Sequence, residues 1–570
     1  MSAPSRAPSS FERTAMLSRL QHEEFDVVVV GGGITGVGVA LDAASRGLRT
    51  ALVERDDFAS GTSSKSSKLV HGGLRYLQQG DVRLVYEALR ERQRLRRNAP
   101  HLVTVLPFMI PILGKPKAAD DQTKSVVNRK IARALGSAMW MYDLTGGWRI
   151  GKLHRRLSKD KALAHMPSMP ASRVLAAYLY FDAAVDDARL VLTVARTAAD
   201  LGAAVANRCA VVGMHHRTDG RVEAVEVEAD GRRFSIRTRA VVNAAGVWSD
   251  RVQQLDEGVD PDSIRPAKGV HVTVPWSKVR NDIAVVIPVP KDKRSLFLVP
   301  WSPNHDGTFR FTYVGTTDTD YQGPLDDPQC TADDIAYVLR ALNASIDPAV
   351  SGGFTADDIT GVWAGLRPLV KTTESGRTAD LSRRHKVSTS EHGVVTVTGG
   401  KLTTYREMAE DAVDEVMDLL ARKGRSRTAR LRLRGAGKDR PVSDPDLLAR
   451  HGSFAHEVLP NDLLDADPTL IEPLVAGLPY LRAEAIYAVR HEMAQSLDDV
   501  LTRRTRARLL DRKASLAASA GIAALIAPHL GWDAAETARQ VAEFRSLCAD
   551  EAAAELVSED ELIASQGAAS

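Results

Sequence analysis

The chain has 570 residues, of which 44% are hydrophobic and 26% charged, and its formal net charge is +3. These values are typical of an ordinary globular protein with a large core and two or three domains, and so small a charge imbalance gives no indication of a nucleic-acid partner. Cys209, Cys330 and Cys548 are far apart and form no C-x-x-C pair, which argues against a disulfide framework, a zinc site or an iron–sulfur cluster, so we expect no metal and a reducing cytosol.

Residues 1–24 are predicted to form a flexible or loosely attached extension. The first ten are rich in Pro and Ser and lack the apolar core of a secretory signal. No stretch approaches the roughly 20 apolar residues that span a bilayer. The nearest, Ala514–Ala527, is alanine-rich, ends at Pro528 and is predicted to be a buried helix. Secretion is not expected, while peripheral membrane contact stays open.

Residues 25–54 follow the pattern strand, glycine turn, helix, strand and terminal acid. Gly31, Gly33 and Gly36 occupy the G-x-G-x-x-G positions, which allow a tight turn, close approach of a pyrophosphate and close packing of the helix on the strand. The helix N-terminus that follows favours phosphate groups. Glu54 ends the second strand, where an acid would hold ribose hydroxyls. The segment therefore predicts binding of an adenine dinucleotide.

The next loop, Asp57–Leu77, is dense in hydroxyl groups and glycine. Composition alone would favour an ordinary Ser/Gly loop, but this one begins where the second strand reaches the cofactor. Its groups suit a long cofactor whose diphosphate and ribityl chain lie extended across the sheet edge, which favours FAD. The candidate contacts are Thr62, Ser63, Ser64, Ser66, Lys68, His71, Gly72 and Gly73.

Further along the chain, two apolar strands run into small residues. Ala240–Asn243 is followed by Ala245 and Gly246, and Val394–Val397 leads to a double glycine that opens a helix. A helix N-terminus there can stabilise negative charge on a reduced isoalloxazine. No second G-x-G-x-x-G occurs, so the reductant is expected to be a small substrate rather than NAD(P)H. The second strand adds the candidate cofactor contacts Gly399, Gly400, Lys401, Leu402 and Thr403.

The remaining elements predict two more domains. A long charged helix is expected over Val82–Arg97, and the patches Ser295–Pro300 and Thr308–Gly315 indicate an antiparallel sheet in a separate substrate domain. From about residue 430 helical patterns such as Arg482–Ala494 continue almost to the end. The last dozen residues are predicted to be disordered.

One segment has an unusual charge balance. Lys115–Lys161 holds 12 Lys and Arg against 4 Asp and Glu, interleaved with Met139, Trp140, Met141 and Trp148. Such a segment can hold a protein on an anionic bilayer, but a solvated basic loop over a partly buried aromatic patch fits equally well. A second basic run, Arg503–Lys513, is predicted to be a solvated helix face.

Several motifs in a fixed order resemble a known family. GGGITGVGVALDAASRGL, TSSKSSKLVHGGLRYL, VDDARL, VGTTDTDY, AGLRPL and TGGKLTTYREMAE follow one another between about residues 25 and 420. Together they resemble the FAD-dependent glycerol-3-phosphate dehydrogenases of aerobic bacteria and mitochondria. AVRHEMAQSLDDVLTRRTR, Ala488–Arg506, resembles the C-terminal signature of that family. No EF-hand calcium loop is evident in the sequence, so the resemblance is to the bacterial form.

Pattern and resemblance together predict an α/β fold. A Rossmann-type FAD-binding domain of the glutathione-reductase/D-amino-acid-oxidase-like class is expected over residues 25–110, 180–265 and 360–425. An antiparallel-sheet substrate domain is expected over 111–179 and 266–359, and an all-helical C-terminal domain over 426–557. Residues 558–570 would form a disordered tail. The FAD is expected to be noncovalent, because no attachment motif is evident.

The resemblance implies oxidation of sn-glycerol 3-phosphate to dihydroxyacetone phosphate, with hydride passing from C2 to flavin N5. Arg75, Arg367 and Lys401 lie in matching motifs and would supply cations for the substrate phosphate. His71 is the candidate base, because it is the only group of the HGG loop that titrates near neutrality; an arginine-activated hydroxyl or a water is the alternative. Tyr76 and Thr317 are further candidate substrate contacts.

The electron acceptor is less well determined by the sequence. The resemblance implies membrane quinone and a cytoplasmic protein held peripherally on the inner face of the plasma membrane. A glycerol-3-phosphate oxidase that reduces oxygen to hydrogen peroxide has the same motifs. A non-catalytic flavin-binding module is the third reading, but it would be expected to lack Arg367, Lys401 or the HGG loop. A homodimer stays open.

Overall fold

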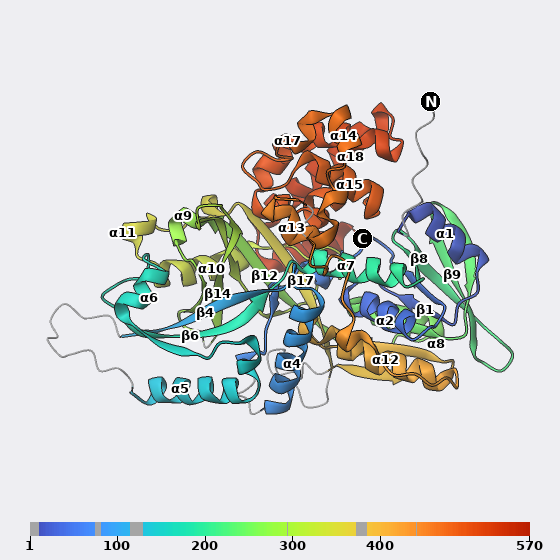
Figure 1. The fold of residues 1–570 in the computed structure, drawn as a ribbon, viewed down its shortest axis with the longest axis horizontal. Coiled ribbons are helices and arrows are strands. Elements are labelled where there is room, and N and C mark those ends of the chain that lie inside the picture. Colours follow the sequence, from blue (N-terminus) through green and yellow to red (C-terminus); the bar gives the residue numbers. More distant parts are fainter. Residues whose placement is uncertain are drawn as a thin grey trace.

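The computed structural model describes residues 11–74, 81–114, 129–292, 294–371, 385–439 and 442–569. Two sheet domains lie side by side, and a cluster of helices from the C-terminal third of the chain lies above them (Figure 1). This arrangement agrees with the predicted α/β fold with a helical C-terminal domain.

The first domain is built on a six-stranded sheet of order β18-β19-β11-β1-β2-β7. The five strands from β19 to β7 run parallel, and β18 pairs antiparallel with β19. The valines of β1 are buried, as expected for a central parallel strand. Helix α2 packs against both α7 and α12, and α8 packs on β11 and β19. The bounds are β1 Val27–Val30, α2 Ile34–Ser45, β2 Thr50–Val53, α7 Asp187–Asp200, β7 Ala204–Ala206, β11 Val241–Asn243, α8 Ser249–Glu257, β18 Lys386–Thr389, β19 Val394–Thr398 and α12 Tyr405–Leu419.

A small antiparallel sheet adjoins this domain and carries the N-terminal helix. It consists of β8 (Ala210–His216), β9 (Val222–Ala229) and β10 (Arg232–Arg237), and α1 (Arg13–His22) packs on β7 and β10. Met16 and Leu20 are buried in the core. The prediction of a flexible extension is therefore wrong for residues 11–24, because two buried side chains hold the helix in place.

The second domain contains a ten-stranded mixed sheet of order β16-β12-β15-β14-β13-β4-β6-β3, in which β17 also pairs with β12 and β5 with β6. All pairs are antiparallel except β13 with β4. The strands β14 and β15 cover the two patches predicted to form an antiparallel sheet. The bounds are β3 Leu69–Val70, β4 Thr104–Leu113, β5 Arg155–Ser158, β6 Val174–Ala184, β12 Ile264–Pro275, β13 Ala284–Pro288, β14 Ser295–Pro303, β15 Phe309–Gly315, β16 Thr319–Asp320 and β17 Gly361–Val370.

One predicted boundary differs from the structure. Residues from 360 onward were expected in the dinucleotide domain, but β17 pairs with β12 from Ile264↔Val370 to Thr273↔Gly361. The AGLRPL motif therefore belongs to the substrate sheet. It is nearer to β19 in the sequence, but its strand forms hydrogen bonds with β12. Helices α4 (Val82–Asn98), α5 (Arg129–Leu144), α6 (Lys159–His165) and α10 (Ala332–Ser345) accompany this domain.

The C-terminal helices are α13 (Pro445–His451), α14 (Asn461–Ala466), α15 (Arg482–His491), α16 (Ala507–Leu510), α17 (Arg512–Leu530), α18 (Ala534–Ala554) and α19 (Glu559–Ala569). The prediction of disorder is wrong for the segment that forms α19. Its Glu559 forms an ion pair with Lys268, a buried side chain of β12 that also pairs with Asp334 at 2.8 Å. A buried ammonium requires such partners, which fixes the start of the helix.

Helix α17 is, within the described residues, the one helix long and apolar enough to cross a membrane by length and composition alone. Only a third of its most apolar window is buried. The helix packs against α15, α16 and α18. The predicted buried helix over Ala514–Ala527 is thus buried on one face only.

Candidate functional site

Two adjoining cavities lie where the parallel strands of the six-stranded sheet end. The first, of about 280 Å³, is lined by residues that follow β1, β2, β11 and β19. The second, of about 200 Å³, extends from it toward β12 and β17. Both cavities are lined by Ile34, Thr62, Ser63, Pro368, Gly399, Gly400, Lys401 and Leu402. A long ligand could therefore lie in the first cavity and reach the second.

The glycine turn forms one wall of the first cavity. Gly31 has φ +112°, and a Cβ there would lie 2.6 Å from the Ala244 carbonyl oxygen. A Cβ at Gly36 would overlap the carbonyl of Gly31, so Gly36 serves the packing of α2 on β1. Gly33 caps α2 and faces the cavity. Backbone N–H groups at the start of α2 can thus meet a pyrophosphate.

Glu54 ends β2 and also lines the first cavity. Its carboxylate accepts hydrogen bonds from the backbone N–H of Gly32 at 2.6 Å and of Asp56 at 2.8 Å. Burial raises the pKa of Glu54 to about 7, although these two hydrogen bonds oppose the shift. The two backbone hydrogen bonds hold the side chain in place at the wall of the first cavity.

The hydroxyl-rich loop divides into residues that reach the cavities and residues that do not. Thr62 and Ser63 line both, and Ser66 lines the second. Ser64 and Lys68 line neither: the ammonium of Lys68 pairs with Asp187 at 3.0 Å and donates to the Ser64 carbonyl at 3.1 Å. The predicted contact of Lys68 with the cofactor is therefore replaced by a buried ion pair behind the loop.

The HGG loop places His71 in the wall of the second cavity. The backbone N–H of His71 donates to Thr403 Oγ1 at 3.3 Å. Gly72 and Gly73 line neither cavity, and the Gly72 N–H donates instead to Tyr142 Oη at 3.2 Å. The predicted contacts Arg75 and Tyr76 lie outside the described residues.

The segments after β11 and β19 also line the cavities. Ala245 and Gly246 line the first cavity, Thr403 lines the second, and Lys401 lies between the two. Gly399 and Gly400 have φ of +72° and +80°, which turns the chain from β19 into the short helical turn Leu402–Thr404 before α12. A helix N-terminus therefore faces the junction of the cavities.

Arg367 of β17 supplies a second cation to the second cavity. Its guanidinium pairs with Asp318 at 3.0 Å and donates to Thr316 Oγ1 at 3.2 Å. Thr316 lines the cavity, whereas Thr317 is buried and its Oγ1 accepts from the Val270 N–H at 2.9 Å. Thr317, the predicted substrate contact, therefore does not line the cavity, whereas its neighbour Thr316 does.

The sequence reasoning missed His271, a buried residue of β12 in the wall of the second cavity. Its ring stacks on Trp363 at 4.8 Å between centroids, and Nε2 lies 2.9 Å from Ser67 Oγ. Nδ1 is buried with no hydrogen-bond partner among the described residues. Burial, with the charges of Lys68 and Arg367, holds the pKa of His271 well below its usual range. The available signal was one titratable residue in the largely apolar stretch Val270–Pro275.

The second basic run is also placed differently from the prediction. Arg504 is buried and forms two hydrogen bonds with Asp57 at 2.6 and 2.8 Å, and Arg506 pairs with Asp187 at 2.5 Å. Asp187 in turn accepts from Ser66 Oγ at 2.7 Å. The run is a buried network that ties the C-terminal helices to the loop of the cavities, and not a solvated helix face.

Part of the predicted basic and aromatic segment lies outside the described residues, at 115–128. Met139 is buried, but Trp140 and Trp148 are 57% and 56% exposed. The Arg149 guanidinium lies over the Trp148 ring at 5.2 Å. The described part of the segment thus combines exposed aromatic side chains with positive charge.

Comparison with known proteins gives two family models and several similar proteins. The models are FAD dependent oxidoreductase over residues 26–406 and C-terminal domain of alpha-glycerophosphate oxidase over residues 426–537. Glycerol-3-phosphate dehydrogenase 2 of Mycobacterium tuberculosis is 39% identical, covering 95% of this chain and 91% of its own. The human mitochondrial glycerol-3-phosphate dehydrogenase is 37% identical, covering 93% of this chain and 73% of its own.

A solved structure is similar over nearly its whole length. The glycerol-3-phosphate dehydrogenase from Bacillus halodurans, complexed with FAD, has a TM-score of 0.73 and 28% identity. The match covers 95% of this chain and 97% of the Bacillus chain. The similarity thus includes the dinucleotide domain, the substrate sheet and the C-terminal helices.

Proposed function

This chain belongs to the FAD-dependent glycerol-3-phosphate dehydrogenases, and on that premise we propose that it oxidises sn-glycerol 3-phosphate to dihydroxyacetone phosphate and passes the electrons to membrane quinone. The observation that carries the proposal is the second cavity, where Arg367, Lys401 and His271 surround a space of about 200 Å³ beside the junction with the dinucleotide cavity. Two cations and a base suit a small phosphorylated alcohol.

The residues of the first cavity fit FAD. The N-terminus of α2 at Gly33 and the carboxylate of Glu54 would hold its pyrophosphate and ribose. The turn from Gly399 to Thr403 would lie along the isoalloxazine, with Lys401 beside it. When bound, the flavin supplies N5 as the acceptor of the C2 hydride. We infer noncovalent binding.

The substrate would be held through its phosphate. The guanidinium of Arg367 is held in a fixed orientation by Asp318 and Thr316, so its positive charge has a fixed position in the cavity wall. Lys401 would add a second charge at the flavin end of the cavity. This arrangement would fix C2 relative to the flavin, because the phosphate and the carbinol are only a few bonds apart.

The proton of the C2 hydroxyl requires an acceptor. His71 and His271 both line the cavity, and we favour His271 because its buried imidazole is held neutral. Ser67 Oγ, at 2.9 Å from Nε2, would hold the ring in place. His71 remains the second candidate.

The first experiment is anaerobic mixing of the purified holoenzyme with sn-glycerol 3-phosphate, followed by the flavin absorbance. Rapid bleaching, with reoxidation by a soluble quinone and little by air, is the expected result. Fast reoxidation by air with release of hydrogen peroxide would favour the oxidase, whose name the C-terminal family model carries. A flavin that stays oxidised would contradict the proposed substrate.

A further inference from the structure

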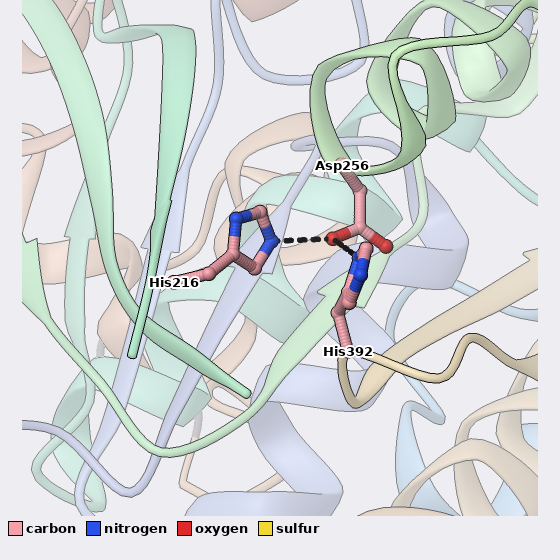
Figure 2. Close-up of side chains that lie close together, drawn as sticks. All are labelled: His216, Asp256 and His392. Carbon is pink, nitrogen blue, oxygen red and sulfur yellow. Dashed lines mark hydrogen bonds and ion pairs between the residues drawn. The ribbon is translucent and has the colours of Figure 1, made fainter. Parts of the chain in front are cut away.

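Three side chains from distant parts of the sequence meet outside the two cavities. His216 ends β8, Asp256 lies in the last turn of α8, and His392 lies in the turn between β18 and β19. Figure 2 shows that all three point toward a common position. Asp256 Oδ1 lies 2.9 Å from His216 Nε2 and 3.0 Å from His392 Nδ1.

The spacing of these atoms matches a metal site. One ligand atom from each residue lies within 4.8 Å of the other two. Zinc binds imidazole nitrogen and carboxylate oxygen at about 2.0–2.2 Å, so two tetrahedral ligands lie roughly 3.3 Å apart. Moving the nitrogens away from Oδ1 by a few tenths of an ångström would admit the ion.

The carboxylate is also oriented as a ligand would be. Ser390 Oγ donates to Asp256 Oδ2 at 2.7 Å, which leaves Oδ1 to face the two imidazoles. Hydrogen bonds of this kind commonly fix the ligands of metal sites and raise their affinity. The serine lies two residues before His392, so one turn supplies both a ligand and its support.

Charge and access favour a cation at this position. The Asp256 side chain is 1% exposed, and within the described residues neither lysine nor arginine forms an ion pair with it. A buried carboxylate is costly without a positive partner. The His216 and His392 side chains are 25% and 34% exposed, so an ion can reach the site from solvent.

We propose that His216 Nε2, His392 Nδ1 and Asp256 Oδ1 bind a divalent transition metal of the zinc class, with water in the remaining position. The site joins three elements that also wall the first cavity, through Val211 of β8, Leu255 of α8 and the end of β19 at Gly399. The ion would therefore hold together three elements that form one wall of the first cavity. It takes no part in the oxidation itself.

The test is equilibrium dialysis of the metal-stripped holoenzyme against Zn²⁺, with the bound metal counted by elemental analysis. The wild type is expected to bind one ion per chain, and His216→Ala and His392→Ala to weaken binding at least tenfold. His215→Ala is the matched control, because His215 is the preceding residue of β8, is exposed and lies outside the cluster. Its binding should equal that of the wild type.

Zinc should also raise the melting temperature of the wild type and of His215→Ala, but not that of the two cluster variants. A wild type that binds no zinc, or cluster variants that bind it unchanged, would overturn the proposal.

A measurement on the wild type alone covers the case in which a variant does not fold. Zinc should protect His216 and His392, but not His215, from carbethoxylation, as read by peptide mass spectrometry. Equal modification with and without zinc would contradict the site.

Discussion

At the scale of single residues, the proposal that His271 is the base of the second cavity can be tested by substitution. His271→Asn should lower turnover by about 10²- to 10³-fold, because removal of a general base costs that much, while the FAD content stays unchanged. The matched comparison is His71→Asn, which alters the same cavity wall. A larger loss of turnover in His71→Asn would assign the base to His71 instead.

The pH dependence of His271 follows from its buried position. Its pKa lies well below the usual value of about 6.5, so the imidazole stays neutral at and below neutral pH, and the acid limb of kcat should fall below pH ~6.5. The unfolded chain binds a proton near pH 6.5 that the folded chain does not. The stability contributed by this residue is therefore lost as the pH falls below ~6.5. An acid limb above that value would exclude His271 as the base.

The glycine turn, Glu54, Lys401 and Arg367 could be found from the sequence, because each lies within a short motif whose order identifies it. The orientations of the Lys68 and Thr317 side chains could not be predicted, because a shift of one position along the chain turns a side chain from the cavity to the interior. His271 and its neighbour Gly269 lie more than 100 residues after His71, the cavity residue that precedes them in the sequence. No spacing rule relates residues that only the fold brings together.

At the scale of elements, the buried arginines fix the C-terminal domain to the loop after β2. Burial alone would raise the pKa of Asp57, but Arg504 and Arg503 outweigh it and lower the pKa below its usual range. Arg504→Leu should cost about 3–5 kcal/mol of stability, because it leaves a buried carboxylate with one charged partner fewer. Thermal unfolding of the holoenzyme measures the effect.

The control is Arg539→Leu, which removes an arginine of α18 that pairs only with side chains on the surface of its own helix. Its effect should stay within roughly 0.5 kcal/mol. Equal melting temperatures for the two variants would show that the Arg504 contact does not hold the domains together. The prediction of a solvated helix face for Arg503–Lys513 was wrong for a physical reason. Charged residues are exposed only when no opposite charge is buried near them, and the buried partner Asp57 lies more than 400 residues away in the sequence.

The elements predicted best are those whose type and bounds follow from their own hydrophobic periodicity. The helix α4 and the strands β14 and β15 lie close to their expected ranges because their own patterns specify them. Helices α1 and α19 were missed because their order depends on contacts with distant partners, Met16 and Leu20 in the core for one and Lys268 for the other. The position of β17 depends in the same way on β12.

At the scale of the whole molecule, about half of the large hydrophobic side chains that are exposed among the described residues lie on α4, α5 and the turn after α5. Helices α4 and α5 lie opposite the C-terminal helices (Figure 1). They and the turn after α5 carry the exposed side chains Val82, Tyr86, Trp140, Met141, Leu144, Trp148 and Leu153. Arg149 and Lys152 lie in the same turn. Aromatic and apolar groups with interspersed basic residues suit the surface of an anionic bilayer.

The edge formed by α4 and α5 is also close to the second cavity. Helix α4 packs on the turn Leu402–Thr404, which lines the second cavity, and the same helix carries the exposed Val82 and Tyr86. A quinone dissolved in the bilayer would thus be brought near the reduced flavin. We therefore expect the protein to lie with this edge on the inner face of the plasma membrane.

Trp140→Ala combined with Trp148→Ala should weaken binding to vesicles containing anionic lipid by about 100-fold, since each exposed ring would lose roughly 1.5 kcal/mol of burial in the interface. Oxidation of glycerol 3-phosphate with a soluble quinone should be unchanged, while activity with a long-chain quinone in the vesicles should fall in parallel with binding. Leu556→Ala, which removes a side chain that is 82% exposed near the C-terminal end of the chain, serves as the control. If it weakens binding as much as the tryptophan pair does, the edge formed by α4 and α5 is not the membrane surface.

Higher salt should also weaken the binding of the wild type to these vesicles, because each basic residue near the lipid contributes about 1 kcal/mol of attraction that ions screen.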